Sequence, residues 1–273
     1  MGAQEFSIGS GARVRWQRFT PAQRLARFTV YLTIVAAVVW SVRTVEVIPE
    51  FLYDAPEQVV DLLVRMWPID WAYYPQTVHA ALIETLHIAT LGTILAILMA
   101  LPLALLAANN LTPSVPLNLA AKLVLVSSRS VNSLVWALLF VAIFGPGALA
   151  GTMAIAFRSV GFVGKLLGEA IEEAHKGPIE ALVATGAPRS SVLLKGYWPQ
   201  VEPAFWSIAL FRWDISMRES AVLGLVGAGG IGMLLESSME LFRWERVALI
   251  LLVIFALVLI AEFVVTYIRK KII

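Results

Sequence analysis

A run of glycines near the end of the chain has a spacing that binds nucleotides in other proteins. Gly227, Gly229 and Gly232 stand as Gly-x-Gly-x-x-Gly in the stretch GLVGAGGIG, the pattern of a turn that holds a pyrophosphate. Such a turn must follow a strand, open a soluble helix and precede an acidic residue by about 20 positions. Here the glycines lie between two apolar segments. The sequence therefore argues against a bound nucleotide.

A second set of residues that could serve function is charged and lies inside apolar segments. These residues are Arg129, Arg158, Arg212, Asp214, Arg218 and Glu219. Charges within a membrane span are costly, so they are expected to pair with one another or to serve function. Asp214 and Arg218 are four residues apart and should pair along one helix face. Arg212 should reach Ser216 or a neighbouring span.

Two interpretations of the arginines stay open. The planar guanidinium group binds an oxyanion bidentately, so Arg129, Arg212 or Arg218 could contact a transported anion transiently. The alternative is structural pairing within a helix bundle or, for Arg158, snorkelling to the membrane interface. Asn132 could extend a polar patch beside Arg129, although interhelical hydrogen bonding would explain it equally.

Other kinds of chemistry find no support in the sequence. Cysteine is absent, which excludes disulfides and thiolate ligands. The three histidines are far apart in sequence, at His79, His87 and His175. The nearest approach to a phosphate-binding loop, Gly164-Lys165, lacks the first glycine and the final Ser or Thr. No catalytic residue, metal site or cofactor is predicted in this chain.

The composition predicts an all-α polytopic membrane protein. Of the 273 residues, 59% are hydrophobic and 15% are charged, and the mean hydropathy is +0.79. A span needs about 20 mostly apolar residues. Six segments meet this requirement, at about 25–45, 80–107, 120–143, 148–167, 203–232 and 247–268.

The charges in the loops predict the orientation. The segment 1–24 and the tail 269–273 are rich in arginine and lysine, so both termini are expected in the cytoplasm. The loop 46–79 is acidic and is expected outside, and the parity of six spans places the loop 168–202 in the cytoplasm. The net charge of +2 is small, which disfavours a nucleic-acid partner.

The external loop contains a predicted helix of its own. Apolar residues recur there at helical spacing and two tryptophans follow, at Val59, Leu62, Leu63, Met66, Trp67 and Trp71. This pattern is typical of a helix lying in the membrane interface. The helix could cap the bundle or form part of a docking surface for an external partner.

The cytoplasmic loop is punctuated by glycine and proline. Residues Ile179 to Thr185 favour a helix, which is expected to end at Gly186. Pro188 can begin a second short helix, which should end before Pro199. Two short helices at an angle would form a protruding knob, with Leu182 and Val183 offering apolar contacts to a partner.

This loop resembles the cytoplasmic signature of the membrane subunits of bacterial binding-protein-dependent ABC importers. That signature runs Glu-Ala-Ala, three residues, Gly, nine residues, Ile-x-Leu-Pro. Glu180, Ala181, Gly186 and Pro199 match it, whereas Leu182, Gly196 and Trp198 depart from it. Across residues 80–268 the chain is similar to phosphonate and phosphite importer permeases, through ETLHIATLG, LPLALLAANN, LVWALLFVAIFGPG, GKLLGEAIE and VGAGGIG.

The resemblance implies a fold, a location and partners. The fold would be that of a type I ABC importer permease in the bacterial cytoplasmic (inner) membrane, with residues 80–268 as its core. A second permease copy, two ATPase subunits that bind ATP and Mg, and an extracytoplasmic substrate-binding protein would complete the complex. The ATPase-coupling residues would be Glu180, Ala181, Leu182, Gly186, Pro188, Gly196 and Pro199.

A stand-alone ion-coupled carrier of a small anion is the alternative, with an ion site at Asp214, Glu219 or Glu262. Such a carrier has no need of the docking knob. Under the importer interpretation, the translocation pathway or gate would include Arg129, Asn132, Arg212, Arg218, Ser220, Gly227, Gly229, Gly230 and Gly232. The glycines would either pack spans closely or break a helix to form a pliable external gate.

Overall fold

The computed structural model describes residues 19–45 and 49–272. All regular elements among these residues are helices, as the composition predicts. The chain divides into two compact units, Met1–Val60 and Asp61–Ile273. The predicted segment 1–24 lies largely outside the described residues, because its description begins at Phe19.

The first unit contains helix α1, Pro21–Thr44, and most of helix α2, Pro49–Arg65. Helix α1 begins with a capping box, in which Thr20 and Gln23 exchange hydrogen bonds. None of its residues is buried, and it is long and apolar enough to cross a membrane. Helix α2 contains most of the predicted interfacial segment.

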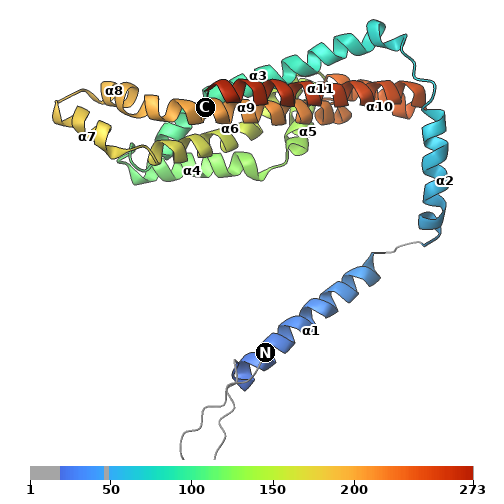
Figure 1. The fold of residues 1–273 in the computed structure, drawn as a ribbon, viewed down its shortest axis with the longest axis horizontal. Coiled ribbons are helices and arrows are strands. Elements are labelled where there is room, and N and C mark those ends of the chain that lie inside the picture. The colour runs from blue at the N-terminus through green and yellow to red at the C-terminus, as the bar shows by residue number, and fades with distance from the viewer. Residues whose placement is uncertain (1–18, 46–48, 273) are drawn as a thin grey trace, which may run out of the picture. The chain divides into compact units, whose positions relative to one another are not determined.

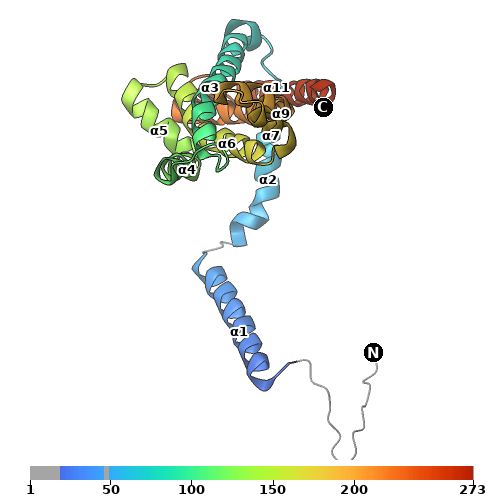
Figure 2. The ribbon, with the colours of Figure 1, turned by 90° about the vertical axis from the view of Figure 1, so that its left-hand side faces the viewer.

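The second unit is a bundle of helices built around α3, α6 and α9 (Figures 1 and 2). Seen end-on, α4 and α5 lie on one side of the bundle and α11 on the other (Figure 2). Its longer helices are α3 (His79–Ala107), α4 (Val115–Ser130), α5 (Ser133–Phe144), α6 (Ala148–Glu172), α9 (Trp198–Leu223), α10 (Ile231–Glu240) and α11 (Trp244–Ile272).

Small residues set the spacing inside the bundle. On α3, Ala89, Ala96, Ala100 and Ala104 are fully buried. On the same helix, a Cβ at Gly92 would lie 2.8 Å from the Ile155 side chain of α6. Helix pairs in membranes associate through such close contacts, because lipid supplies no hydrophobic driving force between them.

The predicted span 120–143 is not one straight helix. Helices α4 and α5 meet at an angle of 91°. The chain is extended at Val131 and Asn132, and the Asn132 side chain caps α5 by accepting from the Leu134 amide at 3.1 Å. The Trp136 indole donates to the Ser128 carbonyl at 3.2 Å, which ties the two helices across the bend. Asparagine prefers this capping position, so a helix begins there anew.

Other boundaries also differ from the predicted spans. Helix α6 continues past residue 167 to Glu172, and α9 runs from Trp198 to Leu223 and stops before the glycines. Among the described residues, five helical segments are long and apolar enough to cross a membrane, and six if the bent α4–α5 pair counts as one span, which agrees with the expected number of about six.

Candidate functional site

Helix α7, Lys176–Ala184, and the turn after it form the first half of the predicted coupling loop. The turn is a Schellman motif. The Ala187 amide donates to the Leu182 carbonyl at 3.2 Å, and the Gly186 amide donates to the Val183 carbonyl at 3.0 Å. Gly186 has φ of +73°, a backbone conformation that glycine adopts without penalty. The predicted stop at Gly186 is confirmed, and its geometry fixes the direction of the next segment.

The inner face of α7 packs against the chain that follows. A Cβ at Gly196 would meet the Leu182 side chain at 3.2 Å and the Ile179 side chain at 3.5 Å. Leu182 therefore contacts its own bundle with part of its side chain, and its predicted contact with a partner stays a prediction. Val183, with 59% of its surface exposed, is the apolar side chain that α7 presents outward.

The second half of the loop is continuous with the bundle. Helix α8, Arg189–Val192, begins after Pro188 and passes through a π-helical turn, Leu193–Tyr197, directly into α9. The predicted end of this helix before Pro199 is not observed, since the helical backbone continues through the π-helical turn into α9, whose second residue is Pro199. The loop thus contains one separate helix, α7, and one long helical rod.

Several residues of the signature lie on the surface of this end of the bundle. Glu180 and Ala181 are exposed on α7, Pro188 and Pro199 are exposed on the rod, and Gly196 is buried between the two. Figure 1 shows α7 and α8 at the opposite end of the bundle from α10.

A buried ion cluster joins α6 to α9. Arg212, almost fully buried, donates to Glu219 at 2.6 Å and to the Ser159 hydroxyl at 2.7 Å. The other carboxylate oxygen of Glu219 binds Arg158. Two guanidinium groups therefore share one carboxylate. Arg212 reaches a neighbouring helix as predicted, whereas Arg158 is paired, and the prediction that it snorkels is wrong.

A second ion pair lies on α9 alone. Asp214 and Arg218 bind each other one helical turn apart, which confirms the predicted pairing. About half of the Arg218 side chain is exposed, while Asp214 is buried. Ser220, proposed for the pathway, is buried and donates to the Met217 carbonyl of its own helix at 2.9 Å.

Arg129 and Asn132 lie on either side of the bend between α4 and α5, and both are exposed. The Asn132 carbonyl oxygen serves as the helix cap described above. The Arg129 side chain forms no ion pair or hydrogen bond with the residues that the structure describes, and it lines a cavity between α4 and α6. The role of both residues in a pathway stays a prediction.

The glycine segment forms a tight loop between α9 and α10. Gly227, Gly229 and Gly230 all have φ between +75° and +84°. A Cβ at Gly224 would lie 2.5 Å from the Gly232 Cα atom, and one at Gly232 would collide with the Ala221 carbonyl oxygen. The Gly147 amide donates to the Gly227 carbonyl at 2.9 Å, which fastens the segment to the start of α6. This geometry is close packing of backbone on backbone, and the proposed gate stays a prediction.

The start of α3 contributes two residues that the sequence analysis did not single out. The Thr85 hydroxyl accepts from the Ile231 amide at 2.7 Å, and it donates to the Ala81 carbonyl at 2.8 Å. The Glu84 carboxylate lies against Gly229, where a Cβ would meet its Oε1 atom at 2.9 Å. The Ile231 amide, which follows the glycines, is therefore occupied by a hydroxyl. Only the three-dimensional fold brings α3 to this segment.

Known proteins are similar to this chain in sequence. PtxC, a phosphite transport system permease protein of Stutzerimonas stutzeri, is 39% identical over 77% of this chain and 76% of its own length. HtxC of the same species is 36% identical over 89% of this chain and 86% of its own length. PhnE, a phosphate-import permease protein of Mycolicibacterium smegmatis, is 37% identical over 86% of this chain and 44% of its own length.

A solved structure supports the fold independently. The crystal structure of an amino acid ABC transporter with histidines superposes with a TM-score of 0.62 and 21% identity, over 73% of this chain and 96% of that chain. Residues 100–273 match the family model for the inner membrane component of binding-protein-dependent transport systems. The chain belongs to this family of ABC importer permeases.

Proposed function

We propose that the chain is the permease subunit of an ATP-driven importer that moves a phosphorus oxyanion, such as phosphite, a phosphonate or phosphate, into the cytoplasm. The observation that carries the substrate class is the similarity, over most of the chain, to PtxC and PhnE, which are named for phosphite transport and phosphate import. A permease that lacks a phosphate-binding loop needs separate subunits to hydrolyse ATP.

Helix α7 would be the docking element for those subunits. It protrudes at one end of the bundle and presents Glu180, Ala181 and Val183 to solvent. The Schellman turn holds it rigidly, and the contact with Gly196 fixes it to the rod of α8 and α9. A rigid element converts closure of an ATPase pair into movement of the spans, whereas a flexible loop would absorb that motion.

This assignment gives the chain an orientation. The end carrying α7 would face the cytoplasm, as would both termini, and the glycine end would face an extracytoplasmic binding protein. Two copies of the chain would pair to form the pathway. Two ATPase subunits, which bind ATP and Mg, would lie on the cytoplasmic side of this pair. The ion-coupled carrier is not favoured, since the chain belongs to an ABC importer family.

Co-purification and uptake together test the proposal. The full chain is expressed with candidate ATPase subunits, reconstituted into liposomes and supplied with a binding protein and labelled phosphite or phosphate. We expect ATP-dependent uptake, and we expect Glu180→Ala to lower ATPase recovery and uptake in parallel. Glu202→Ala removes an exposed carboxylate from α9 and serves as the matched control. Uptake that survives without ATP or any ATPase subunit would contradict the importer.

A further inference from the structure

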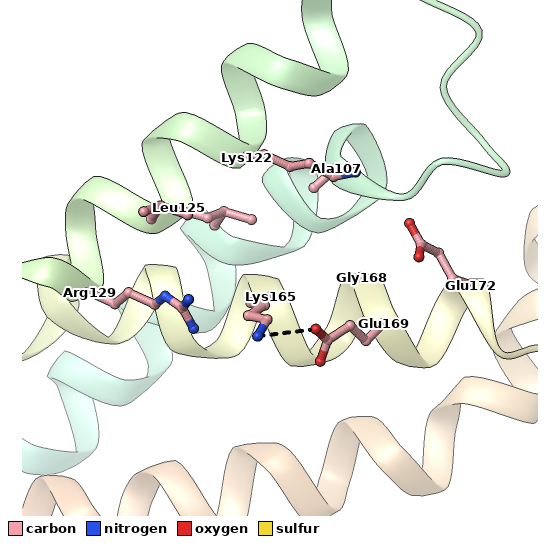
Figure 3. Close-up of a pocket in the computed structure, with 9 residues that line it drawn as sticks. Ala107, Lys122, Leu125, Arg129, Lys165, Gly168, Glu169 and Glu172 are labelled. Atoms are coloured by element: carbon pink, nitrogen blue, oxygen red, sulfur yellow. Dashed lines mark ion pairs between the residues drawn. The ribbon is translucent and has the colours of Figure 1, made fainter. Parts of the chain in front are cut away.

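The strongest feature that the proposed function leaves unused is a cavity of about 270 Å³ between α4 and α6, near the last turn of α3. It lies toward the end of the bundle that carries α7. Apolar residues line part of it. Three cationic side chains and two carboxylates line the rest, namely Lys122, Arg129, Lys165, Glu169 and Glu172. Figure 3 shows the side chains of Arg129, Lys165 and Glu169 along the gap between α4 and α6, with Glu172 at the far end.

Glycines on α6 set the distance between α4 and α6 beside this cavity. A Cβ at Gly161 would collide with the Leu125 carbonyl oxygen, and one at Gly164 would lie 2.5 Å from the Leu125 side chain. Helix α4 therefore rests directly on α6 at this level. One turn further on, Gly168 has no side chain to fill the space and lines the cavity.

The positive charges of the cavity are incompletely neutralised. Lys122 donates to the Asn109 side-chain oxygen at 2.7 Å, which is a neutral acceptor. Lys165 lies 3.3 Å from Glu169, and both side chains are about half exposed, so this pair contributes little. Glu172 accepts a hydrogen bond from the Asn109 backbone amide at 2.7 Å.

Arg129 is the cationic side chain of this cavity that the described residues leave without a partner. Arg158, Arg212 and Arg218, the arginines of α6 and α9 in the middle of the bundle, each bind a carboxylate. The Arg129 guanidinium, by contrast, is exposed, lines the cavity and has no acidic or hydrogen-bonding partner among the described residues. All of its donors are therefore available to an anion that enters the cavity.

We infer that this cavity binds a phosphate group, with Arg129 as the bidentate contact and Lys122 and Lys165 as flanking charges. The guanidinium fork matches phosphate oxygens, and lysine supplies a point charge. A cavity of 270 Å³ has room for a phosphate and several waters, at about 30 Å³ for each water. The phosphate belongs either to an anionic phospholipid, which basic pockets between membrane helices bind, or to a free phosphorus oxyanion.

Binding measured on the purified full chain tests the inference and separates the two sources. In the first arm, phosphatidylglycerol is titrated into the protein in mild detergent, and native mass spectrometry counts the retained lipids, with phosphatidylcholine as the reference. In the second arm, inorganic phosphate is titrated in the absence of anionic lipid, and the thermal midpoint is recorded. Retention of phosphatidylglycerol identifies a lipid site, and a shift with inorganic phosphate identifies a free-anion site.

Variants of the lining residues decide whether binding takes place in this cavity. Arg129→Gln should weaken binding at least tenfold for whichever probe the wild type binds, phosphatidylglycerol or inorganic phosphate. Arg129→Lys should recover part of that binding. Lys122→Gln, which leaves Arg129 in place, should also weaken binding. Arg65→Gln is the control, because it removes an exposed arginine far from the cavity and should leave binding unchanged. Equal binding by wild type and Arg129→Gln with both probes, in samples that remain monodisperse, would overturn the inference. Uptake is not measured, so this failure would leave the proposed transport function untouched.

Discussion

At one end of the bundle, Gly224, Gly229 and Gly232 occupy positions where an added Cβ would meet backbone atoms at 2.7 Å or less. At the other end, Gly186 has nothing within 4 Å of the place where a Cβ would stand, and only its φ of +73° favours glycine. The first end has no space for a side chain, and the second has space but an unusual backbone. Glycine is thus required for close packing at the first end, and for the direction of the chain at the second.

The difference extends to the charges near each end. In the packed region, Glu219 is partly buried, binds the buried Arg212 as well as Arg158, and joins two helices. At the α7 end, Glu180 is exposed, and no ion pair is found for it among the described residues. A change in the packed region should therefore cost stability, whereas a change at the α7 end should cost an interaction with another protein.

The largest effect should come from Glu219→Gln. The substitution leaves two arginine charges without a carboxylate, and breaking a buried ion pair costs about 3–5 kcal/mol. The free energy of unfolding, measured by denaturant titration in detergent, should fall by that amount. Glu202→Gln, on the exposed side of α9, should leave it unchanged. If both variants behave alike, the cluster does not hold α6 to α9.

Gly232→Ala should have the next largest effect. Its Cβ would collide with the Ala221 carbonyl oxygen and lie 2.7 Å from the Gly224 Cα atom, and backbone atoms cannot move aside cheaply. We expect a loss of about 3 kcal/mol, read as a lower thermal midpoint. Gly177→Ala is the control, because nothing lies within 4 Å of its added Cβ. A tolerated Gly232→Ala combined with stalled uptake would favour a gate over packing.

Gly186→Ala should destabilise the chain by about 1 kcal/mol, since a left-handed backbone penalises a Cβ. The bundle should stay intact, while the direction of the chain after α7 changes and ATPase recovery falls. Gly186→Asn is the matched variant, because asparagine tolerates this conformation better. Equal recovery of ATPase with wild type and both variants would show that the turn does not position α7.

Val183→Glu should have the smallest effect on folding, within about 0.5 kcal/mol, because the side chain is exposed. It places a charge on the apolar surface of α7 that a partner would cover. Co-purification with the ATPase should be lost, while Val183→Leu should retain it. Undiminished recovery with Val183→Glu would remove this surface from the proposed interface.

Features that depend on neighbours in sequence could be predicted from the sequence. The stop at Gly186 follows from local backbone chemistry, and the Asp214–Arg218 pair follows from helical spacing. The helical class and the approximate number of spans follow from runs of apolar residues. The 91° bend also has a local cause in the cap at Asn132, but the apolar residues of the two flanking helices favoured a single span over 120–143.

Features that depend on the packing of distant segments could not be predicted. Arg158 and Glu219 are 61 residues apart in sequence, and only the contact between α6 and α9 joins them. Leu182 looks like a surface contact until the chain brings Gly196 beneath it. Hydrophobic spacing reports that a residue is apolar, but it does not report which neighbour the residue meets.

The unbroken passage from α8 into α9 has a mechanical consequence. From Arg189 to Leu223 the chain forms one helical rod, about 50 Å long at 1.5 Å per residue. Such a rod acts as a lever. A tilt of only about 5° applied at its α8 end would displace its opposite end by about 4 Å. The opposite end of the rod adjoins the tightly packed glycine segment, so such a tilt would move the backbone atoms against which these glycines pack.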